Sequence, residues 1–286
     1  MSQLLLNDKL YAAPVRPSLI KKFKNIKELF LPEDGFICGD ADLAQADARV
    51  VAWDADDETL KEIFLSNLDL HTENAITIFG SCPNKSHPNR KKAKAGVHAV
   101  NYNVHAKTLA KTLGITIKEA EYFIKRWFEA HPKIKKWHER IYHEMMVEHR
   151  IRNAFGFEKR FFDKRDNFTS LSEALAWIPQ STVAIIINKV WMKMEELDQS
   201  NVYVTMQTHD SLNFEMRSNM IPELALQIEQ CFNVVVPYED PLVIPGTLGL
   251  GRDYGNLVDT TWDGYIIDPD TGLATPEVSE HWRKAA

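Results

Sequence analysis

The sequence has 286 residues, of which 44% are hydrophobic and 26% are charged. These fractions are typical of a soluble globular protein and exclude a disordered or collagen-like chain. The longest apolar runs, such as residues 183–187, are far shorter than the ~20 residues that span a bilayer, and the N-terminus has no signal-peptide pattern, so we expect a cytoplasmic protein without a membrane partner. The formal net charge of −6, taken alone, disfavours nucleic acid as a partner.

The predicted elements, taken in chain order, are a strand, a long run of helices, and then two strands with a helix. A short amphipathic helix is predicted near residues 19–26, and a short buried strand at 36–39 places Asp40 and Asp42 at or just beyond its end. Further helices are predicted at 44–55, 58–65, 90–105, 117–130, 133–150, 170–197 and 221–232, with a hairpin or loop at 153–162 and two strands within 201–215. We therefore expect an α+β fold, in which a long helical segment is inserted between the strands of a small sheet.

Two aspartates are candidate metal ligands. Asp42 follows the first predicted strand, and Asp210 lies at the tip of the predicted strand pair. If these strands are neighbours in one sheet, the two carboxylates converge, as two divalent cations that bind a triphosphate require. On these residues alone, a turn or capping role is the alternative.

A basic segment lies between Asn74 and Lys118, where the sequence contains no Asp or Glu. Such a segment attracts phosphate. Within it, four residues recur at every fourth position and would form one stripe on a helix: Arg90, Lys94, His98 and Tyr102. The stripe offers cations for phosphate oxygens and a ring on which a base can stack. The alternative is a solvated basic face with a half-buried tyrosine.

Four segments resemble, in order and spacing, the motifs of the family A (polymerase I-like) DNA polymerases. Residues 42–49 resemble motif A, Asp-Tyr-Ser-Gln-Ile-Glu-Leu-Arg, and residues 69–73 resemble Asp-Ile-His-Thr-Glu. Residues 90–102 are similar to the motif B helix, Arg-x3-Lys-x3-Phe/Tyr-x3-Tyr, and residues 206–210 to motif C. The match extends over roughly residues 14–258. The resemblance implies an α+β fold with a small antiparallel palm sheet and a large inserted helical fingers subdomain.

The resemblance also divides the chain. It implies a lead-in at 1–29, a first palm part with motif A at 30–72, fingers with motif B at 73–168, a second palm part with motif C at 169–258, and a C-terminal extension at 259–286. The family's thumb and 3′–5′ exonuclease domain have no counterpart in these segments. We therefore expect the palm and fingers subunit of a split, phage-encoded polymerase, which would work in the host cytoplasm with a second polypeptide that supplies the thumb and an exonuclease.

Roles of individual residues are implied by the same resemblance. Asp42 and Asp210 would be catalytic and hold two magnesium ions, with manganese as an alternative, and the backbone carbonyl of Leu43 would complete the second metal site. The residues implied to bind the incoming nucleotide are Gln45, Asp47, His71, Arg90, Lys94, His98 and Tyr102. Among these, Arg90, Lys94 and His71 would act as cations that bind the triphosphate. The residues implied to contact DNA are Arg49, Gln180 and His209.

Three positions bear on sugar selectivity and activity. An acid at Asp47 would block a ribose 2′-hydroxyl, although Asp is one methylene shorter than the family's Glu. His98 replaces a Phe or Tyr that contacts the sugar of the nucleotide. Ser211 replaces the Glu that follows the motif C aspartate in the family. That Glu is not an essential ligand, so we expect activity to survive.

The predicted function is a template-directed DNA polymerase that adds deoxynucleotides to a primer 3′-hydroxyl by two-metal catalysis, in DNA replication. Its partners would be primer-template DNA and deoxynucleoside triphosphates. One alternative is a catalytically weak or silent DNA-binding scaffold subunit of a replisome, which the presence of Asp42, Asp210, Arg90, Lys94 and Tyr102 disfavours. Another is a relative of the single-subunit RNA polymerases, which Asp47 and Gln45 disfavour.

Overall fold

The computed structural model describes residues 26–66, 68–162, 167–268 and 274, so the helix predicted at 19–26 lies almost wholly outside the described residues. The chain forms two compact units. The first, which we call the sheet unit, consists of the described parts of residues 1–42, 194–229 and 247–286. The second, which we call the helical unit, consists of the described parts of residues 43–193 and 230–246.

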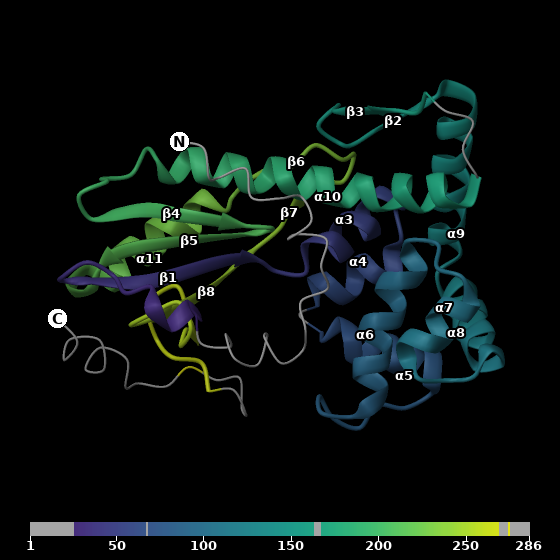
Figure 1. The fold of residues 1–286 in the computed structure, drawn as a ribbon, viewed down its shortest axis with the longest axis horizontal. Coiled ribbons are helices and arrows are strands. Elements are labelled where there is room, and N and C mark those ends of the chain that lie inside the picture. Colours follow the sequence, from purple (N-terminus) through teal and green to yellow (C-terminus); the bar gives the residue numbers. More distant parts are fainter. Residues whose placement is uncertain (1–25, 67, 163–166, 269–273, 275–286) are drawn as a thin grey trace, which may run out of the picture. The chain divides into compact units, whose positions relative to one another are not determined.

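A five-stranded sheet forms the centre of the sheet unit. Its strand order is β4 (Val202–Thr208), β5 (Ser211–Arg217), β1 (Phe36–Leu43), β8 (Gly246–Gly251) and β9 (Val258–Thr260) (Figure 1). The pairs β4–β5, β5–β1 and β8–β9 are antiparallel. The helix α11 (Ile221–Cys231) follows β5 and a short 3₁₀ turn at Ser218–Met220, and another 3₁₀ turn, Ile26–Leu29, precedes β1. The strand pair predicted around His209 and Asp210 is confirmed.

Strand β1 is longer than the sequence predicted. It continues past Gly39 through both aspartates to Leu43. In this second half Ala41 and Leu43 are buried, whereas Asp40 and Asp42 are half-buried. The prediction followed the apolar run and missed the alternation after it, because a strand with one buried face needs an apolar residue only at every second position.

The helical unit contains most of the helices. They are α3 (Ala46–Asp54), α4 (Glu58–Leu65), α5 (Leu70–Phe79), α6 (Pro88–Asn101), α7 (Ala106–Leu113), α8 (Ile117–Ala130), α9 (Pro132–His143), a π-helical turn at Glu144–Glu148 and α10 (Asn167–Met194). Between the π-helical turn and α10 lies a hairpin of β2 (Arg150–Arg152) and β3 (Glu158–Arg160), and later in the chain β6 (Val235–Val236) pairs with β7 (Leu242–Val243). The predicted fold class, a small antiparallel sheet with a large helical insertion, is confirmed.

The helix predicted at 90–105 ends earlier than predicted. Two further helices, α5 and α7, were not predicted. Helix α6 ends at Asn101, and Asn103 adopts a left-handed conformation with φ of 59°, which breaks the helix before α7 begins. Helix α5 was not predicted, although Asp69 caps its first turn and Gly80 ends it with φ of 79°. The hairpin predicted at 153–162 is present, and its strands begin at Arg150.

The core of the helical unit includes the aromatic face predicted for α8 and α9. Trp127, Trp137, Ile134, Ile141 and Met145 are all buried. By length and composition, the segment Ser170–Met194 of α10 is long and apolar enough to cross a membrane. The uninterrupted apolar runs of the sequence did not predict this, because polar residues divide the segment. Half of the most apolar stretch of this segment is buried within the protein.

Candidate active site

The two candidate catalytic aspartates lie on neighbouring strands of the sheet unit. In the β1–β5 pairing Asp42 is opposite Ser211, which directly follows Asp210. Asp210 lies in the two-residue turn between β4 and β5, where His209 has a left-handed φ of 56°. The sequence analysis expected the two carboxylates to converge if their strands are neighbours in one sheet. Strands β1 and β5 are such neighbours. A non-glycine residue in this conformation is uncommon, and such strain concentrates at functional sites.

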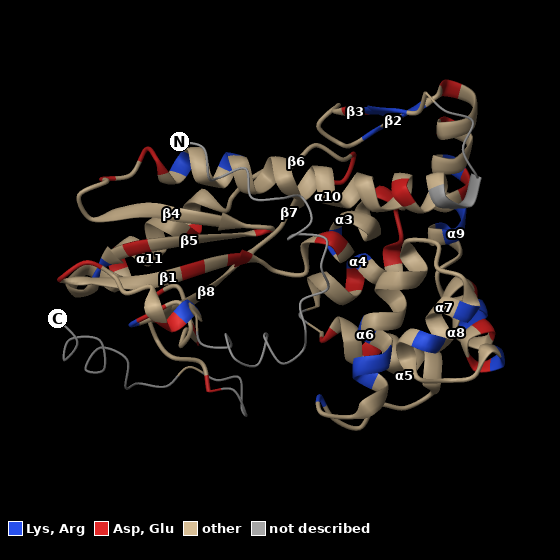
Figure 2. Cartoon of the chain, in the orientation of Figure 1, with Lys and Arg blue, Asp and Glu red and all other residues tan. Residues whose placement is uncertain are grey.

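A third carboxylate, Asp40, lies on the same face of β1 as Asp42, because side chains two residues apart in a strand share a face. Its Oδ2 accepts a hydrogen bond of 2.6 Å from Nδ2 of Asn213, the residue opposite it on β5. Burial raises the pKa of Asp40, hydrogen bonds from Asn213 and Ser211 lower it, and the charge of Asp210 raises it further. The sheet unit thus gathers acidic side chains at one end of β1 and β5, and red marks this part of β1 in Figure 2.

The donors of this region suit magnesium that is shared with a substrate. Carboxylate oxygens are hard ligands, and magnesium commonly uses one or two of them together with substrate phosphates. Within the described residues no group of three or more His, Cys, Asp or Glu side chains could hold a metal ion. The hydroxyl of Ser211, the residue after Asp210, donates to the Thr208 carbonyl at 3.2 Å within the same turn.

In the helical unit, Arg90 is held by Asp69. Arg90 Nε donates to Oδ1 of Asp69 at 2.9 Å, and Nη2 donates to Oδ2 at 2.6 Å. Asp69 Oδ1 also accepts from the backbone N–H of Thr72 at 2.7 Å, so the same carboxylate caps α5. The hydrogen bonds from Arg90 hold the pKa of Asp69 well below its usual range. This two-point pairing fixes the guanidinium plane at the first turn of α6.

His71 lies in the first turn of α5, near the same cations. Burial, and then the charges of Lys94 and Arg90, lower its pKa to about 4. The sequence predicted a cation at this position, and the structure corrects that point, because the ring is neutral at neutral pH. Its Nδ1 is buried and has no hydrogen-bond partner among the described residues. A neutral imidazole can still donate one hydrogen bond to a phosphate oxygen.

Residues of motifs A and B meet within the helical unit. The Tyr102 hydroxyl, at the end of α6, donates to Oδ2 of Asp47 on α3 at 2.9 Å. Burial, and then the Asp47 charge, raise the pKa of Tyr102 far above its usual value. The rings of His98 and Tyr102 pack edge to face with their centroids 4.7 Å apart. The predicted stripe therefore exists, although Tyr102 caps the helix and does not lie inside it. Lys94 and His98 are exposed on the same helix, and blue marks the basic residues of α6 in Figure 2.

The remaining predicted residues differ in accessibility. Gln180 on α10, His209 and Gln45 are exposed, and Gln45 precedes α3 in a left-handed conformation with φ of 53°. Leu43 ends β1 and is buried. Arg49, predicted to contact DNA, makes interactions within the protein. Its Nε donates to the Ala44 carbonyl at 3.0 Å, and its guanidinium lies 4.6 Å from the centre of the Phe64 ring.

Comparison with known proteins identifies the family. The sequence model of DNA polymerase family A matches residues 10–255. This chain belongs to that family. The thermostable DNA polymerase I of Thermus filiformis is 30% identical over 248 residues, which are 84% of this chain and 29% of that protein. The Thermus aquaticus enzyme is 28% identical with the same coverage, and DNA polymerase I of Bacillus caldotenax is 29% identical over 242 residues, 80% of this chain and 27% of that protein.

The chain spans less than a third of the length of these curated family A relatives. Among solved structures, the POL domain of Pol1 from M. smegmatis, in a complex with DNA primer-template and dNTP, matches with a TM-score of 0.74. It is 20% identical in sequence and covers 85% of this chain and 44% of that one. At this identity the likeness supports the fold.

Sequence reasoning missed two residues that shape the candidate site. Asp69 was quoted within a family motif but received no role, although an Asp three residues before the N–H of Thr72 is a helix-capping signal. Asp40 was noted only as a strand-end residue. Its pairing with Asn213 had no sequence signal, because the two residues are 173 positions apart and meet only through the β1–β5 register.

Proposed function

We propose that this chain carries the catalytic centre of a template-directed DNA polymerase, which adds deoxynucleotides to a primer 3′-hydroxyl. The observation that carries the proposal is that Asp42, on β1, lies opposite Ser211, the first residue of the adjacent strand β5, which directly follows Asp210. Membership of DNA polymerase family A supports the reaction class. Since the chain spans a minor part of its relatives, the activity, the substrates and the partners are proposals for this chain.

Asp42, Asp210 and the backbone carbonyl of Leu43 would hold two magnesium ions. When bound, these ions would lower the pKa of the primer hydroxyl and neutralise charge on the leaving pyrophosphate. The protein's part is to keep hard oxygen ligands close together on a rigid sheet. The half-buried positions of Asp42 and Asp210 in and beside the five-stranded sheet suit that task.

Residues of α5 and α6 would bind the triphosphate of the incoming nucleotide. Arg90 and Lys94 would supply positive charge, and the neutral ring of His71 would donate a hydrogen bond. The Asp69 pairing supports this role, because it fixes the Arg90 guanidinium before any ligand arrives and so lowers the entropic cost of binding. Asp47, held by Tyr102, would exclude a ribose 2′-hydroxyl, and His98 would contact the sugar.

The test is incorporation of a single nucleotide on a primed template with magnesium, with deoxynucleotides and ribonucleotides compared. We expect Asp210→Ala and Asp42→Ala each to lower the rate at least ~1,000-fold, about 4 kcal/mol in the activation free energy. Asp240→Ala is the matched control, because the Asp240 carboxylate is exposed and pairs with Lys61 at 3.2 Å. It should retain the wild-type rate.

Each other outcome has a defined meaning. Template binding without incorporation by the wild-type chain, even with an added thumb-bearing polypeptide, would contradict the proposal and indicate a scaffold subunit. A preference for ribonucleotides would indicate the RNA polymerase alternative. The proposed second polypeptide has its own test, which is gel filtration and primer extension with the purified chain. Strong, processive synthesis by the monomer alone would contradict it.

A further inference from the structure

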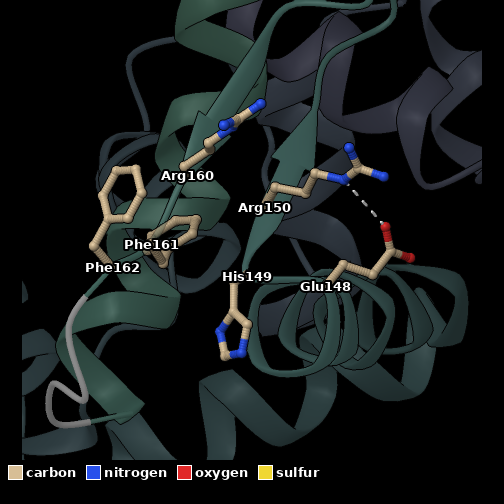
Figure 3. A pocket seen from close by; sticks show the side chains of 6 residues that line it. All are labelled: Glu148, His149, Arg150, Arg160, Phe161 and Phe162. Atoms are coloured by element: carbon tan, nitrogen blue, oxygen red, sulfur yellow. Dashed lines mark ion pairs between the residues drawn. The ribbon is translucent and has the colours of Figure 1, made fainter.

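An open hollow of about 510 Å³ lies in the helical unit, and it includes none of the predicted site residues. It is lined by Glu148, His149 and Arg150, which follow α9, and by Arg160, Phe161 and Phe162 at the end of β3 (Figure 3). We call this the hairpin hollow. Polar and aromatic side chains thus face the same open space, an arrangement that sites for flat ligands with charged groups share.

One side of the hollow carries an exposed aromatic ring. Phe162 is 87% exposed, which is unusual for a large apolar side chain in the described part of the chain. The backbone next to it is nevertheless held in place, because the Phe161 N–H donates to the His149 carbonyl at 2.8 Å. The ring of Phe162 is therefore presented to solvent from an ordered strand end.

The charges of the hairpin are concentrated on one of its faces. Arg150 is directly opposite Arg160 in the β2–β3 register, and Arg152 is opposite Glu158, so these four side chains share a face. The carboxylate of Glu158 pairs with Arg150 at 3.4 Å, with Arg160 at 3.6 Å and also with Arg152. One carboxylate therefore orients three guanidinium groups and compensates only part of their charge.

Directly opposed like charges destabilise a hairpin, so the Arg150–Arg160 pair costs folding energy that Glu158 only partly offsets. Glu148 adds a weaker contact to Arg150 at 3.6 Å. Arg160 is 63% exposed and Arg152 54% exposed, so both can reach an external anion. Arg160 in the hollow next to an exposed ring, with Arg152 on the same face of the hairpin, suits a ligand that combines phosphates with an accessible aromatic face.

We propose that the hairpin hollow binds single-stranded DNA, namely the unpaired part of the template. A base would stack on Phe162 and a backbone phosphate would contact Arg160, while Arg152, outside the hollow on the same face of the hairpin, would contact a second phosphate. A single strand is favoured over a duplex because only unpaired bases expose their faces for stacking. The proposal deepens the proposed function, on which it rests for the identity of the nucleic acid.

The experiment measures fluorescence anisotropy of a short labelled oligothymidylate and, separately, of a blunt DNA duplex. We expect Phe162→Ala to weaken oligothymidylate binding about 10-fold, in line with the stacking contribution of one base. Arg160→Gln should lower the slope of log affinity against log salt by about 0.7, the value for one phosphate contact on a single strand. Both variants should bind the duplex within about 2-fold of wild type. They remove only the stacking of an unpaired base and one phosphate contact on the single strand.

Matched controls exist on α8. Tyr122 is also an exposed aromatic residue, at 58%, and Lys125 is an exposed cation, at 73%. Tyr122→Ala and Lys125→Gln should leave oligothymidylate binding unchanged. Circular dichroism and thermal melting of each variant would show that folding is retained.

Three results would overturn the inference: no oligothymidylate binding by wild type, unchanged affinity in Phe162→Ala, or an equal loss in the Tyr122→Ala control. Unchanged oligothymidylate affinity together with lost binding of an added polypeptide would assign the hollow to a protein partner, which also overturns it. The single-nucleotide assay separates the two proposals. If Phe162→Ala weakens oligothymidylate binding but the wild-type chain incorporates no nucleotide, the proposed function fails and the hollow stands.

Discussion

The two units arrange their charged residues in opposite ways. In the sheet unit Asp40 accepts its 2.6 Å hydrogen bond from the neutral amide of Asn213 and lies near a second acid, Asp210. In the helical unit Asp69 accepts two hydrogen bonds from the guanidinium of Arg90. Burial, with a smaller contribution from the Asp210 charge, raises the pKa of Asp40, whereas the hydrogen bonds from Arg90 lower the pKa of Asp69. Negative charge is therefore costly at Asp40 and compensated at Asp69, and this difference can be tested by pH and by mutation.

The largest expected effect is the acid sensitivity of the helical unit. His138 is buried, its Nε2 lies 2.9 Å from the Asn101 carbonyl, and burial lowers its pKa from 6.5 to about 4. Below pH 6.5 the unfolded state binds a proton that the folded state does not, so stability falls as the pH drops from 6.5 toward 4. His138 alone should contribute about 3 kcal/mol to this loss. The described part of the sheet unit has only one histidine, His209, which is exposed.

The measurement is urea unfolding between pH 7 and pH 4 for wild type and His138→Gln. The glutamine amide can still donate to the Asn101 carbonyl but does not titrate, so the variant should lose less stability across this range. His143→Gln, at an exposed position of the same helix, is the control and should follow wild type. Parallel pH profiles for wild type and His138→Gln would refute the prediction.

The next effect concerns the compensated carboxylate of the helical unit. Asp69→Asn keeps a capping oxygen for Thr72 but removes the charge that pairs with Arg90. At pH 7 we expect the free energy of unfolding to fall by about 2 kcal/mol, the usual contribution of hydrogen bonds between charged groups. The lowered pKa of Asp69 means that this contribution exists above the unfolded-state pKa and is lost as the pH falls through the folded-state value.

Asp69→Ala serves as the companion variant. It removes the cap as well as the charge, so it should cost about 1 kcal/mol more than Asp69→Asn. Chemical denaturation at pH 7 measures both values. Equal stability of wild type and Asp69→Asn would show that the Arg90 pair contributes nothing.

A smaller effect of opposite sign is expected for the sheet unit. The raised pKa of Asp40 means that its ionised form is disfavoured by folding, and this penalty grows as the pH rises above the unfolded-state pKa. Asp40→Asn should therefore increase the free energy of unfolding by about 1 kcal/mol at pH 7, measured without divalent cations. The gain should vanish at pH 3, where the carboxyl is protonated in both states. A loss of stability at pH 7 would contradict the contrast between the two units.

Some of this structure was accessible from sequence because the signals are local. Helices α4 and α8 have the predicted bounds, since each begins after a residue whose side chain caps it, Asp57 or Thr116, and continues with an apolar period. The order of elements and the β4–β5 turn also follow from local patterns. Family resemblance implied a joint metal-binding role for Asp42 and Asp210, which no local pattern could establish.

The rest depends on contacts between distant residues. The Asp69–Arg90 pair joins residues 21 positions apart, and Tyr102 and Asp47 are 55 apart. The contact of the Arg49 guanidinium with the Phe64 ring had no sequence signal either, and the predicted contact of Arg49 with DNA stays a prediction. Such contacts depend on how the helices pack against one another. Apolar periodicity predicts which face of a helix is buried, but not which residues that face contacts.

The smallest effect tests how Asp47 is held in the helical unit. Tyr102→Phe removes the hydroxyl that donates to Asp47 at 2.9 Å but keeps the ring that packs against His98. Asp47 then loses one hydrogen bond, worth about 1 kcal/mol, and samples more rotamers. If Asp47 excludes the ribose 2′-hydroxyl, the ratio of kcat/KM for deoxynucleotides over ribonucleotides should fall about 5-fold, the equivalent of that energy. The kcat/KM for deoxynucleotides should change less, and Tyr122→Phe should change neither value. An unchanged ratio would mean that Asp47 keeps its position without Tyr102, so that the packing of α3 alone sets the selectivity.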